Sequence, residues 1–436
     1  MIGKKEATFT MDSNVTTKHR KNAGFLSIIP GFGQFYNKQF VKGIIFLVLT
    51  VAFFSSFSQT LNWGFWGLIT LGEIPILDHS IFLLIDGIIA LLVSIIGLGI
   101  YAFNIYDAYN NGKKRDEGFL LNSVREQYHN LLDNGFPYLM ISPGFLLLIF
   151  VVIFPIIFVI LLSFTNYDLY HSPPAKLVDW VGIQNYIDIF KLDLWRSTFF
   201  GVLGWTIVWT FGATTLQVAI GVFLAVVINQ KDLKGKAFFR TILILPWAVP
   251  AFVSILIFSG MFNESFGVIN TQILSMLGID AIPWMTEEMW TRLALILIQS
   301  WLGFPFIFAM TTGVLQSIPE ELYEAANVDG ASIFQKFRGI TLPMVLYATA
   351  PILITQYTFN FNNFNVIFLF NGGGPAIPGQ NAGGTDILIS WIYQLTMTSG
   401  QYGKAAAITM LLSLIVIVVA LWQFKRTNSF KEEDMM

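Results

Sequence analysis

The sequence contains no cysteine and only four histidines. The missing cysteines exclude disulfide bonds, thiolate metal sites and a catalytic thiol. His19, His79, His129 and His171 are scattered along the chain, and none has a second histidine or a carboxylate at the spacing of metal ligands. We therefore expect no metal site.

Motifs for nucleotide binding and hydrolysis are also missing. Gly-Lys pairs begin at Gly3, Gly112, Gly235 and Gly403, but none stands in the Gly-x-x-x-x-Gly-Lys-Ser/Thr context of a phosphate-binding loop. Neither a Gly-x-Ser-x-Gly elbow nor a His-Glu-x-x-His zinc helix is present. The sequence predicts a protein that is not an enzyme and carries no cofactor.

Charged residues are scarce, at 12% of the chain, whereas 55% of the residues are hydrophobic. An average soluble domain has about 25% charged residues, and the net charge of −2 argues against a nucleic-acid partner. A bilayer core about 30 Å thick needs roughly 20 apolar residues of helix. Eight stretches qualify, at about 42–58, 81–105, 138–164, 198–228, 241–262, 292–313, 343–370 and 404–424. We expect an all-α integral membrane protein with eight transmembrane helices.

Lysine and arginine predict the orientation of these helices. With the N-terminus inside, the inner segments hold 20 of the 25 basic residues and the outer loops hold five. Basic residues accumulate on the cytoplasmic side of membrane proteins. Both termini and the loop around Glu324 are therefore predicted to be cytoplasmic. The polar segment before the first span is too long for a signal peptide, so we interpret that span as retained.

The segment 317–343 is a polar island between two apolar spans. Ser317-Ile318-Pro319-Glu320 has the pattern of a capping box, in which the serine oxygen accepts from a free backbone N–H at a helix start. We expect a helix to begin there and to end at Gly330, because glycine tolerates the positive φ of a helix end.

A second short helix is predicted directly after this glycine. Ser332 and Gln335 form a second candidate cap, and the helix would carry Phe334 and Phe337 and end before Pro343. Exposed aromatic residues on a cytoplasmic loop favour a docking surface for a partner protein. The alternative is a connector that packs on the membrane helices of its own chain.

Between Glu324 and Pro343 the chain reads EAANVDGASIFQKFRGITLP. Three residues separate Glu-Ala-Ala from Gly330, and nine more precede Ile-x-Leu-Pro. This run resembles the EAA motif of the membrane-spanning subunits of binding-protein-dependent ABC importers, and it matches at every defined position. In that family the loop is the coupling helix that docks in a cleft of the cytoplasmic ATPase. The resemblance implies that Glu324, Ala325, Ala326 and Gly330 couple this chain to an ATPase.

The resemblance extends from about residue 138 to the end, and it is strongest to the larger permease subunit of maltose and maltodextrin importers, which also has eight spans. It implies a type I ABC importer permease fold. The implied parts are a cytoplasmic N-terminal segment 1–41, two additional helices within 42–110, a linker 111–137, a six-helix core 138–424 with the coupling loop 317–343, and a cytoplasmic tail 425–436. The enteric subunit has a large extracellular domain between its third and fourth spans, where this chain has about 33 residues. Residues 1–110 match only loosely and receive no function.

The seventh predicted span contains four asparagines within six residues, between Asn360 and Asn365. On a helix, Gln356, Phe359, Asn360 and Asn363 would share an arc of about 100°. Amides donate to and accept from hydroxyl groups, and an aromatic ring packs on the apolar side of a pyranose, so this face suits a neutral sugar. The alternative is hydrogen bonding between neighbouring membrane helices.

The family resemblance adds residues to this candidate site. In the maltose permease, the positions of Phe359, Asn360 and Asn363 touch the sugar. The sixth-span stretch from Trp301 to Phe306 resembles another part of the same pocket. The resemblance implicates Leu302, Gly303 and Phe306 there, together with the neighbouring positions Ser300 and Gln356. Phe306, Ser300 and Gln356 differ from the enteric residues Tyr, Asn and Ser.

The sequence thus predicts a permease subunit of an ATP-driven importer in a bacterial plasma membrane. The implied partners are a second permease subunit, a cytoplasmic ATPase dimer and an extracellular solute-binding protein. The implied substrate is a maltose- or maltodextrin-like neutral oligosaccharide. One alternative is another sugar class, such as galacto-oligosaccharides. A second is an ion-coupled transporter, although Asp86 is the one acid well within a predicted span, and a third is a structural membrane scaffold.

Overall fold

The computed structural model of the chain describes residues 18–133, 135–230 and 233–426. It divides into two compact units, Met1–Val181 and Gly182–Met436, and each is described by itself. Regular structure within the described residues is helical, apart from two isolated β-bridges. The predicted all-α class is confirmed. The first 17 residues and most of the predicted tail 425–436 lie outside the described residues.

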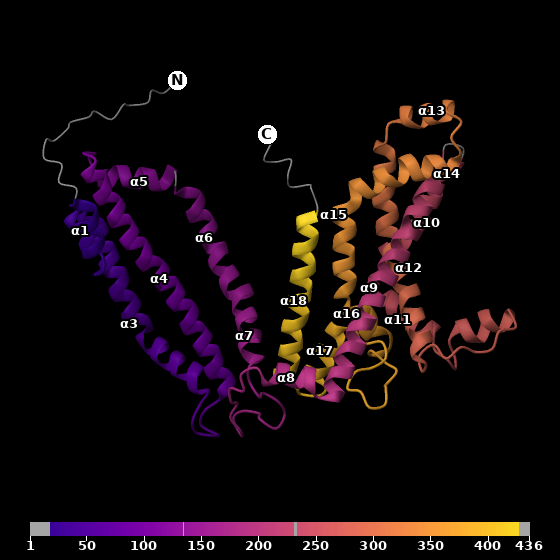
Figure 1. The fold of residues 1–436 in the computed structure, drawn as a ribbon, viewed down its shortest axis with the longest axis horizontal. Coiled ribbons are helices and arrows are strands. Elements are labelled where there is room, and N and C mark those ends of the chain that lie inside the picture. Colours follow the sequence, from indigo (N-terminus) through magenta and orange to yellow (C-terminus); the bar gives the residue numbers. More distant parts are fainter. Residues whose placement is uncertain (1–17, 134, 231–232, 427–436) are drawn as a thin grey trace. The chain divides into compact units, whose positions relative to one another are not determined.

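The first unit is built around a hairpin of two long helices (Figure 1). Its helices are α1 (His19–Leu26), α2 (Phe32–Tyr36), α3 (Phe40–Thr70), α4 (Ser80–Asp116), α5 (Val124–Asp133), α6 (Phe136–Leu148), the π-helical turn η1 (Ile149–Ile153) and α7 (Phe154–Leu162). Glycines let α3 and α4 approach closely. A Cβ on Gly64 would lie 2.6 Å from the Cβ of Ala90, and one on Gly87 would lie 2.6 Å from the Cβ of Leu68. Small residues of this kind allow close helix packing in membranes.

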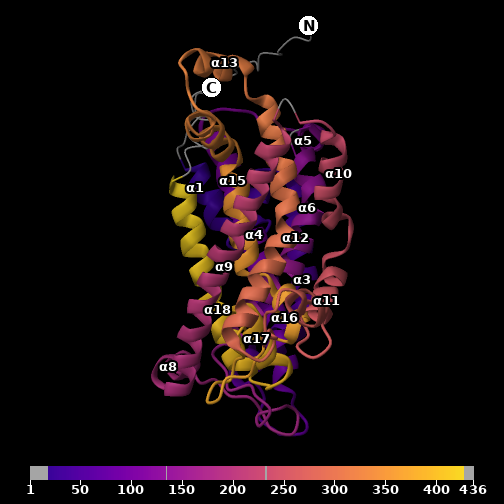
Figure 2. The same ribbon diagram turned by 90° about the vertical axis from the view of Figure 1, so that its right-hand side faces the viewer.

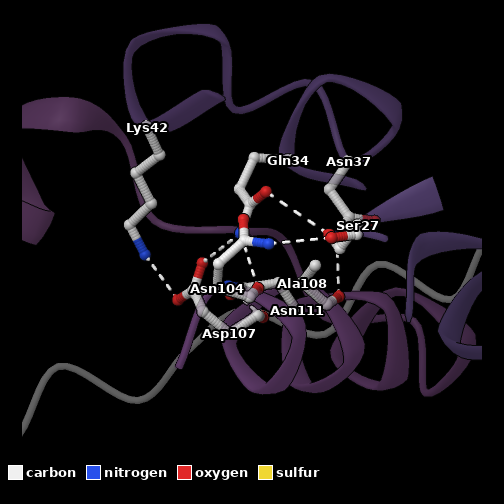
Figure 3. Close-up of polar contacts among 8 residues, drawn as sticks. All are labelled: Ser27, Gln34, Asn37, Lys42, Asn104, Asp107, Ala108 and Asn111. Carbon is white, nitrogen blue, oxygen red and sulfur yellow. Dashed lines mark hydrogen bonds and ion pairs between the residues drawn. The ribbon is translucent and has the colours of Figure 1, made fainter. Parts of the chain in front are cut away.

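The segment before α3 folds back onto the inner end of α4, and amide side chains hold it there (Figure 3). The Asn104 Oδ1 atom accepts from the Gly31 N–H at 3.1 Å. Gln34 donates to the Asn104 carbonyl at 2.9 Å, and Asn37 donates to the Ala108 carbonyl at 2.8 Å. Gly31 has φ +88°, which explains a glycine at this turn. The polar residues of this segment therefore serve the structure of the hairpin.

The second unit contains the other spans. Its elements are α8 (Gln184–Lys191), α9 (Asp193–Ile228), α10 (Lys236–Ala248), α11 (Ala251–Met261), η2 (Ile269–Leu274), α12 (Glu288–Ser317), α13 (Glu320–Val328), α14 (Ile333–Lys336), η3 (Phe337–Thr341), α15 (Leu342–Phe361), α16 (Phe364–Asn371), α17 (Leu388–Met397) and α18 (Tyr402–Arg426). Helices α9 and α12 pack side by side, and Trp205, Trp209, Leu295 and Ile298 lie in the core between them and their neighbours. Within this unit, α13 lies beyond one end of the long helices, and α8, α16 and α17 lie at the opposite end (Figures 1 and 2).

Seven helices among the described residues are long and apolar enough to span a membrane, and an eighth span results if α10 and α11 are counted together. The predicted eight spans agree with this count, but two predicted continuous helices are broken. Helices α10 and α11 meet at 89°. Val249 is extended there because Pro250 disfavours a helical conformation in the residue before it. The predicted span 343–370 breaks at Asn362 and Asn363, between α15 and α16.

Candidate functional site

The polar loop 317–343 forms a helix, a tight turn and a second helix, as predicted. Helix α13 ends before Gly330, which has φ +73°. The Ala331 N–H donates to the Ala326 carbonyl at 2.9 Å, which closes the helix end. The second predicted cap is confirmed, since Ser332 Oγ accepts from Gln335 N at 3.3 Å and Ser332 N donates to Gln335 Oε1 at 2.7 Å.

Two predictions for this loop are wrong. Ser317 does not cap α13, because α12 continues through it and its hydroxyl donates to the Val314 carbonyl at 2.8 Å. The second helix does not end before Pro343, because α14 continues through the π-helical turn η3 into α15. In that turn the Leu342 N–H donates to the Phe337 carbonyl, five residues earlier. Pro343 then occupies the first turn of α15, where a missing N–H is tolerated.

The loop presents an apolar face on a fixed framework. Val328, Ile333 and Phe334 are 88%, 80% and 67% exposed. The Tyr323 hydroxyl bonds Thr341 Oγ1 at 2.9 Å, which ties α13 to η3. Of the four residues carried over from the motif, Glu324, Ala325 and Gly330 are exposed and Ala326 is half-buried. An ordered apolar face of this kind, beyond the ends of the spans, suits a protein partner.

The break between α15 and α16 lies in a buried network of amide side chains. Asn360 is fully buried, and its Nδ2 atom donates to Thr214 Oγ1 on α9 at 2.8 Å. Its backbone carbonyl accepts from the Trp209 indole N–H at 2.8 Å. Asn363 donates to Gln299 Oε1 on α12 at 3.0 Å. The two predicted asparagines are thus brought together and joined to two other spans.

Gln217 extends this network toward Gln356. The Gln299 Nε2 atom donates to Gln217 Oε1 at 3.4 Å, and Gln217 Nε2 lies 3.5 Å from Gln356 Oε1. Gly303 provides the room for this arrangement, because a Cβ on Gly303 would lie only 1.9 Å from Gln217 Oε1. We call this set of hydrogen-bonded side chains the amide network. Its members are five amides and one hydroxyl: Gln217, Gln299, Gln356, Asn360, Asn363 and Thr214.

The other predicted substrate residues lie outside the network. Phe359 is 61% exposed. Leu302 packs against the core beside α9, and the ring of Phe306 packs on Trp247 with centroids 5.8 Å apart. The Ser300 hydroxyl is buried and donates to the Ile296 carbonyl of its own helix at 2.7 Å. The structure therefore does not bring Ser300 to the asparagines.

Sequence reasoning missed Gln217 and Gln299, the two glutamines that link the asparagines to α9 and α12. Their signal was present, because a glutamine inside an apolar span is costly unless it has a partner. All members of the network are neutral donors and acceptors, so the network offers no countercharge for an ion. Their hydrogen bonds join α9, α12 and α15.

The outer loop between α16 and α17 is held by a buried acid. Asp386 accepts from the Gly383 N–H and from the Ser390 hydroxyl, each at 2.7 Å, and from Gln394 Nε2 at 3.2 Å. Gln394 also donates to the Gly372 carbonyl at 2.7 Å, so both ends of the loop are fixed to α17. Burial raises the pKa of Asp386 to about 7, although the Gly383 and Ser390 hydrogen bonds lower it.

Comparison with known proteins identifies the family. Residues 217–427 match the binding-protein-dependent transport system inner membrane component. Over 417 residues the chain is 63% identical to the galactooligosaccharides transport system permease protein GanP of Bacillus subtilis, covering 95% of this chain and all of that relative. The chain belongs to the permease subunits of binding-protein-dependent sugar importers. It is therefore a multi-pass protein of the bacterial plasma membrane and a transport subunit rather than an enzyme.

Other relatives of this permease subunit agree. The maltodextrin transport system permease protein MdxF of Bacillus subtilis is 50% identical over 428 residues, covering 96% of this chain and 98% of the relative. The fold resembles a solved bacterial ABC transporter involved in the import of alginate, with a TM-score of 0.56 and 22% identity over 69% of this chain and 97% of that chain. The predicted ABC importer permease fold is confirmed.

Proposed function

We propose that this permease subunit conducts a neutral oligosaccharide and that the amide network contributes the hydrogen-bonding groups of its path. The observation that carries this proposal is the meeting of Asn360, Asn363 and Gln299 at the break between α15 and α16. Broken membrane helices are tolerated where the backbone lines a cavity or a substrate site. Gln356 is the half-buried member of the network, and Leu302, Gly303 and Phe306 on α12 are half-buried as well. We propose these four residues as the accessible edge of the network.

Within the oligosaccharides we propose galacto-oligosaccharides as the first substrate class and maltodextrins as the second. The relative named for galactooligosaccharides is 63% identical, whereas the relative named for maltodextrin is 50% identical, and both match nearly the whole chain. The order reverses the sequence-based preference for a maltodextrin-like substrate. Both classes are neutral and rich in hydroxyl groups, so the amide network suits either one.

The proposed partners follow from the two ends of the second unit. The apolar face of α13 and α14 would receive a separate cytoplasmic ATPase, which hydrolyses the ATP. Glu324, Ala325, Ala326 and Gly330 would lie in that contact. A second permease subunit would complete the path, and an extracellular binding protein would deliver the sugar at the side of the outer loop. ATP can drive the path only if the ATPase binds its two conformations with different free energies.

Competition for uptake tests the substrate proposal. Cells that express the whole importer take up a labelled galacto-oligosaccharide, and unlabelled galacto-oligosaccharides, maltodextrins or a charged oligosaccharide are added. We expect strong competition from galacto-oligosaccharides, weaker competition from maltodextrins and none from the charged sugar. Stronger competition from maltodextrins than from galacto-oligosaccharides would make maltodextrins the preferred substrate class. Competition only by the charged sugar would contradict the neutral path.

The same assay tests the site with a matched pair of variants. Asn363→Ala removes a network member, whereas Asn362→Ala removes a neighbouring amide that donates to the Thr358 carbonyl of its own helix. We expect Asn363→Ala to raise the half-saturating sugar concentration about fivefold, since one hydrogen bond contributes about 1 kcal/mol, and Asn362→Ala to have little effect. Copurification of the partner subunits checks that both variants assemble.

A further inference from the structure

An apolar groove runs along the hairpin of the first unit. Its volume is about 820 Å³, and it is lined by α3 between Phe46 and Leu61, by α4 between Ser94 and Asn104, and by the turn at Ile28. The fifteen steps from Phe46 to Leu61, at 1.5 Å each, give the groove a length of about 22 Å. The groove is therefore longer than the hydrocarbon depth of one leaflet, which is about 15 Å, half of a core about 30 Å thick.

The polar groups near the inner end of this groove are already engaged. The Asn104 side chain accepts from Gly31 N and donates to the Ser27 carbonyl at 2.9 Å. The Tyr101 hydroxyl donates to the Ile28 carbonyl at 3.1 Å, and Thr50 donates to the Phe46 carbonyl at 2.8 Å. Because these groups are used within the protein, the inner part of the groove favours an apolar occupant over a sugar or an ion.

Exposed basic residues lie beyond the inner end of the groove. Lys18 and Lys21, at the start of α1, and Lys38, just before α3, are exposed. Nearby acids are engaged elsewhere: Asp107 pairs with Lys42 at 2.8 Å (Figure 3), and Asp116 accepts from the backbone N–H groups of His19 and Arg20 at 2.9 and 3.1 Å. The region therefore carries an excess of positive charge.

The segment before α3 and the first turns of α3 also expose apolar side chains. These are Phe25, Leu26, Ile28, Ile29, Phe32, Phe40, Val41, Ile44 and Ile45, each between 37% and 73% exposed. A basic segment with large apolar side chains on its other face is typical of a membrane interface rich in anionic lipid. The apolar side chains thus suit the acyl chain of a lipid, and the lysines suit its anionic headgroup.

We propose that the groove between α3 and α4 binds an acyl chain of an anionic phospholipid from the inner leaflet, with its phosphate held beside Lys21 and Lys38. The hydrogen bonds of Asn104 and Gln34 fix the turn that forms the inner wall, so the groove is a preformed feature of the fold. Every lining residue of the groove belongs to the first unit.

Photocrosslinking of the whole importer tests the site. The complex is placed in phosphatidylcholine nanodiscs that contain a phosphatidylglycerol with a photoreactive group in its acyl chain, and the labelled peptides are mapped by mass spectrometry. We expect labels on the groove residues of α3 and α4. Unlabelled phosphatidylglycerol should displace the probe, and added phosphatidylcholine should not. Lys21→Gln and Lys38→Gln should each lower the labelling about fivefold, because a lysine near an anionic surface contributes about 1 kcal/mol.

A matched pair of substitutions separates a bound lipid from general contact with the bilayer. Leu98 lines the groove and is 64% exposed, whereas Ile95 on the same helix is 56% exposed and lies outside it. Leu98→Trp should abolish the labelling, and Ile95→Trp should leave it unchanged, in complexes that assemble equally. Uniform labelling around the hairpin, equal loss in both variants, or crosslinking of the groove to a protein subunit would overturn the proposal.

Discussion

At the residue scale, the amide network depends on how Gln217 fits against Gly303. The Gln217 side chain occupies the space beside Gly303. A Cβ added to residue 303 would lie only 1.9 Å from Gln217 Oε1. Gln217 connects Gln299 to Gln356 and thereby joins α9, α12 and α15. A methyl group at position 303 would displace this amide and leave buried polar groups without partners, which costs about 1–3 kcal/mol for each group.

A double-mutant cycle on Gly303 and Gln217 tests this interaction. Gly303→Ala and Gln217→Ala should each reduce the thermal stability of the complex and its apparent affinity for sugar. The double variant should lose less stability than the sum of the two single losses, by about 1 kcal/mol or more, because Gln217→Ala removes the side chain with which a methyl group at position 303 clashes. Gly313→Ala on the same helix is the control, since its Cβ would meet no atom within 4 Å. Additive effects would show that the two residues do not interact.

At the element scale, breaks in helices distinguish the observed fold from the predicted one. Capping and glycine act within a few residues, so Gly330 and the Ser332–Gln335 cap could be predicted from the sequence. Pro250 also gave a local signal, but the apolar run around it suggested a continuous span. The break at Asn362 could not be predicted, because Asn363 bonds Gln299, which is 64 residues away and reaches it only through the packing of α12.

The outer loop gives an element-scale prediction, because buried Asp386 holds both of its ends on α17. Its pKa is raised from 3.8 to about 7, so the folded protein binds the proton more tightly than the unfolded chain. The resulting stabilisation is fully present below about pH 4 and is lost as the pH rises through 7. The loss is at most about 1.4 kcal/mol for each pH unit.

Asp386→Asn removes this titration and keeps an acceptor for the Gly383 N–H. Thermal stability of the purified complex is measured between pH 5 and pH 8. The stability of the wild type relative to Asp386→Asn should fall as the pH rises to about 7 and then become constant. A difference that does not change with pH would show that Asp386 is charged throughout this range.

At the scale of the whole molecule, the sequence predicted the class of protein better than the details of its site. Composition and the run from Glu324 to Pro343 predicted a membrane-spanning permease subunit, which is the class to which the chain belongs. The amide network required the tertiary structure, since Gln217 and Gln299 are 82 residues apart. The hairpin groove was also missed, because its lining reads as ordinary membrane helix in the sequence.

The central claim is that this chain is a membrane path driven by a separate ATPase through the loop formed by α13 and α14. Sugar uptake into proteoliposomes tests it most directly, with the two permease subunits and the binding protein present and the ATPase either included or omitted. We expect uptake only with the ATPase and ATP, and none from an ion gradient alone. Uptake without the ATPase, driven by an ion gradient, would contradict it.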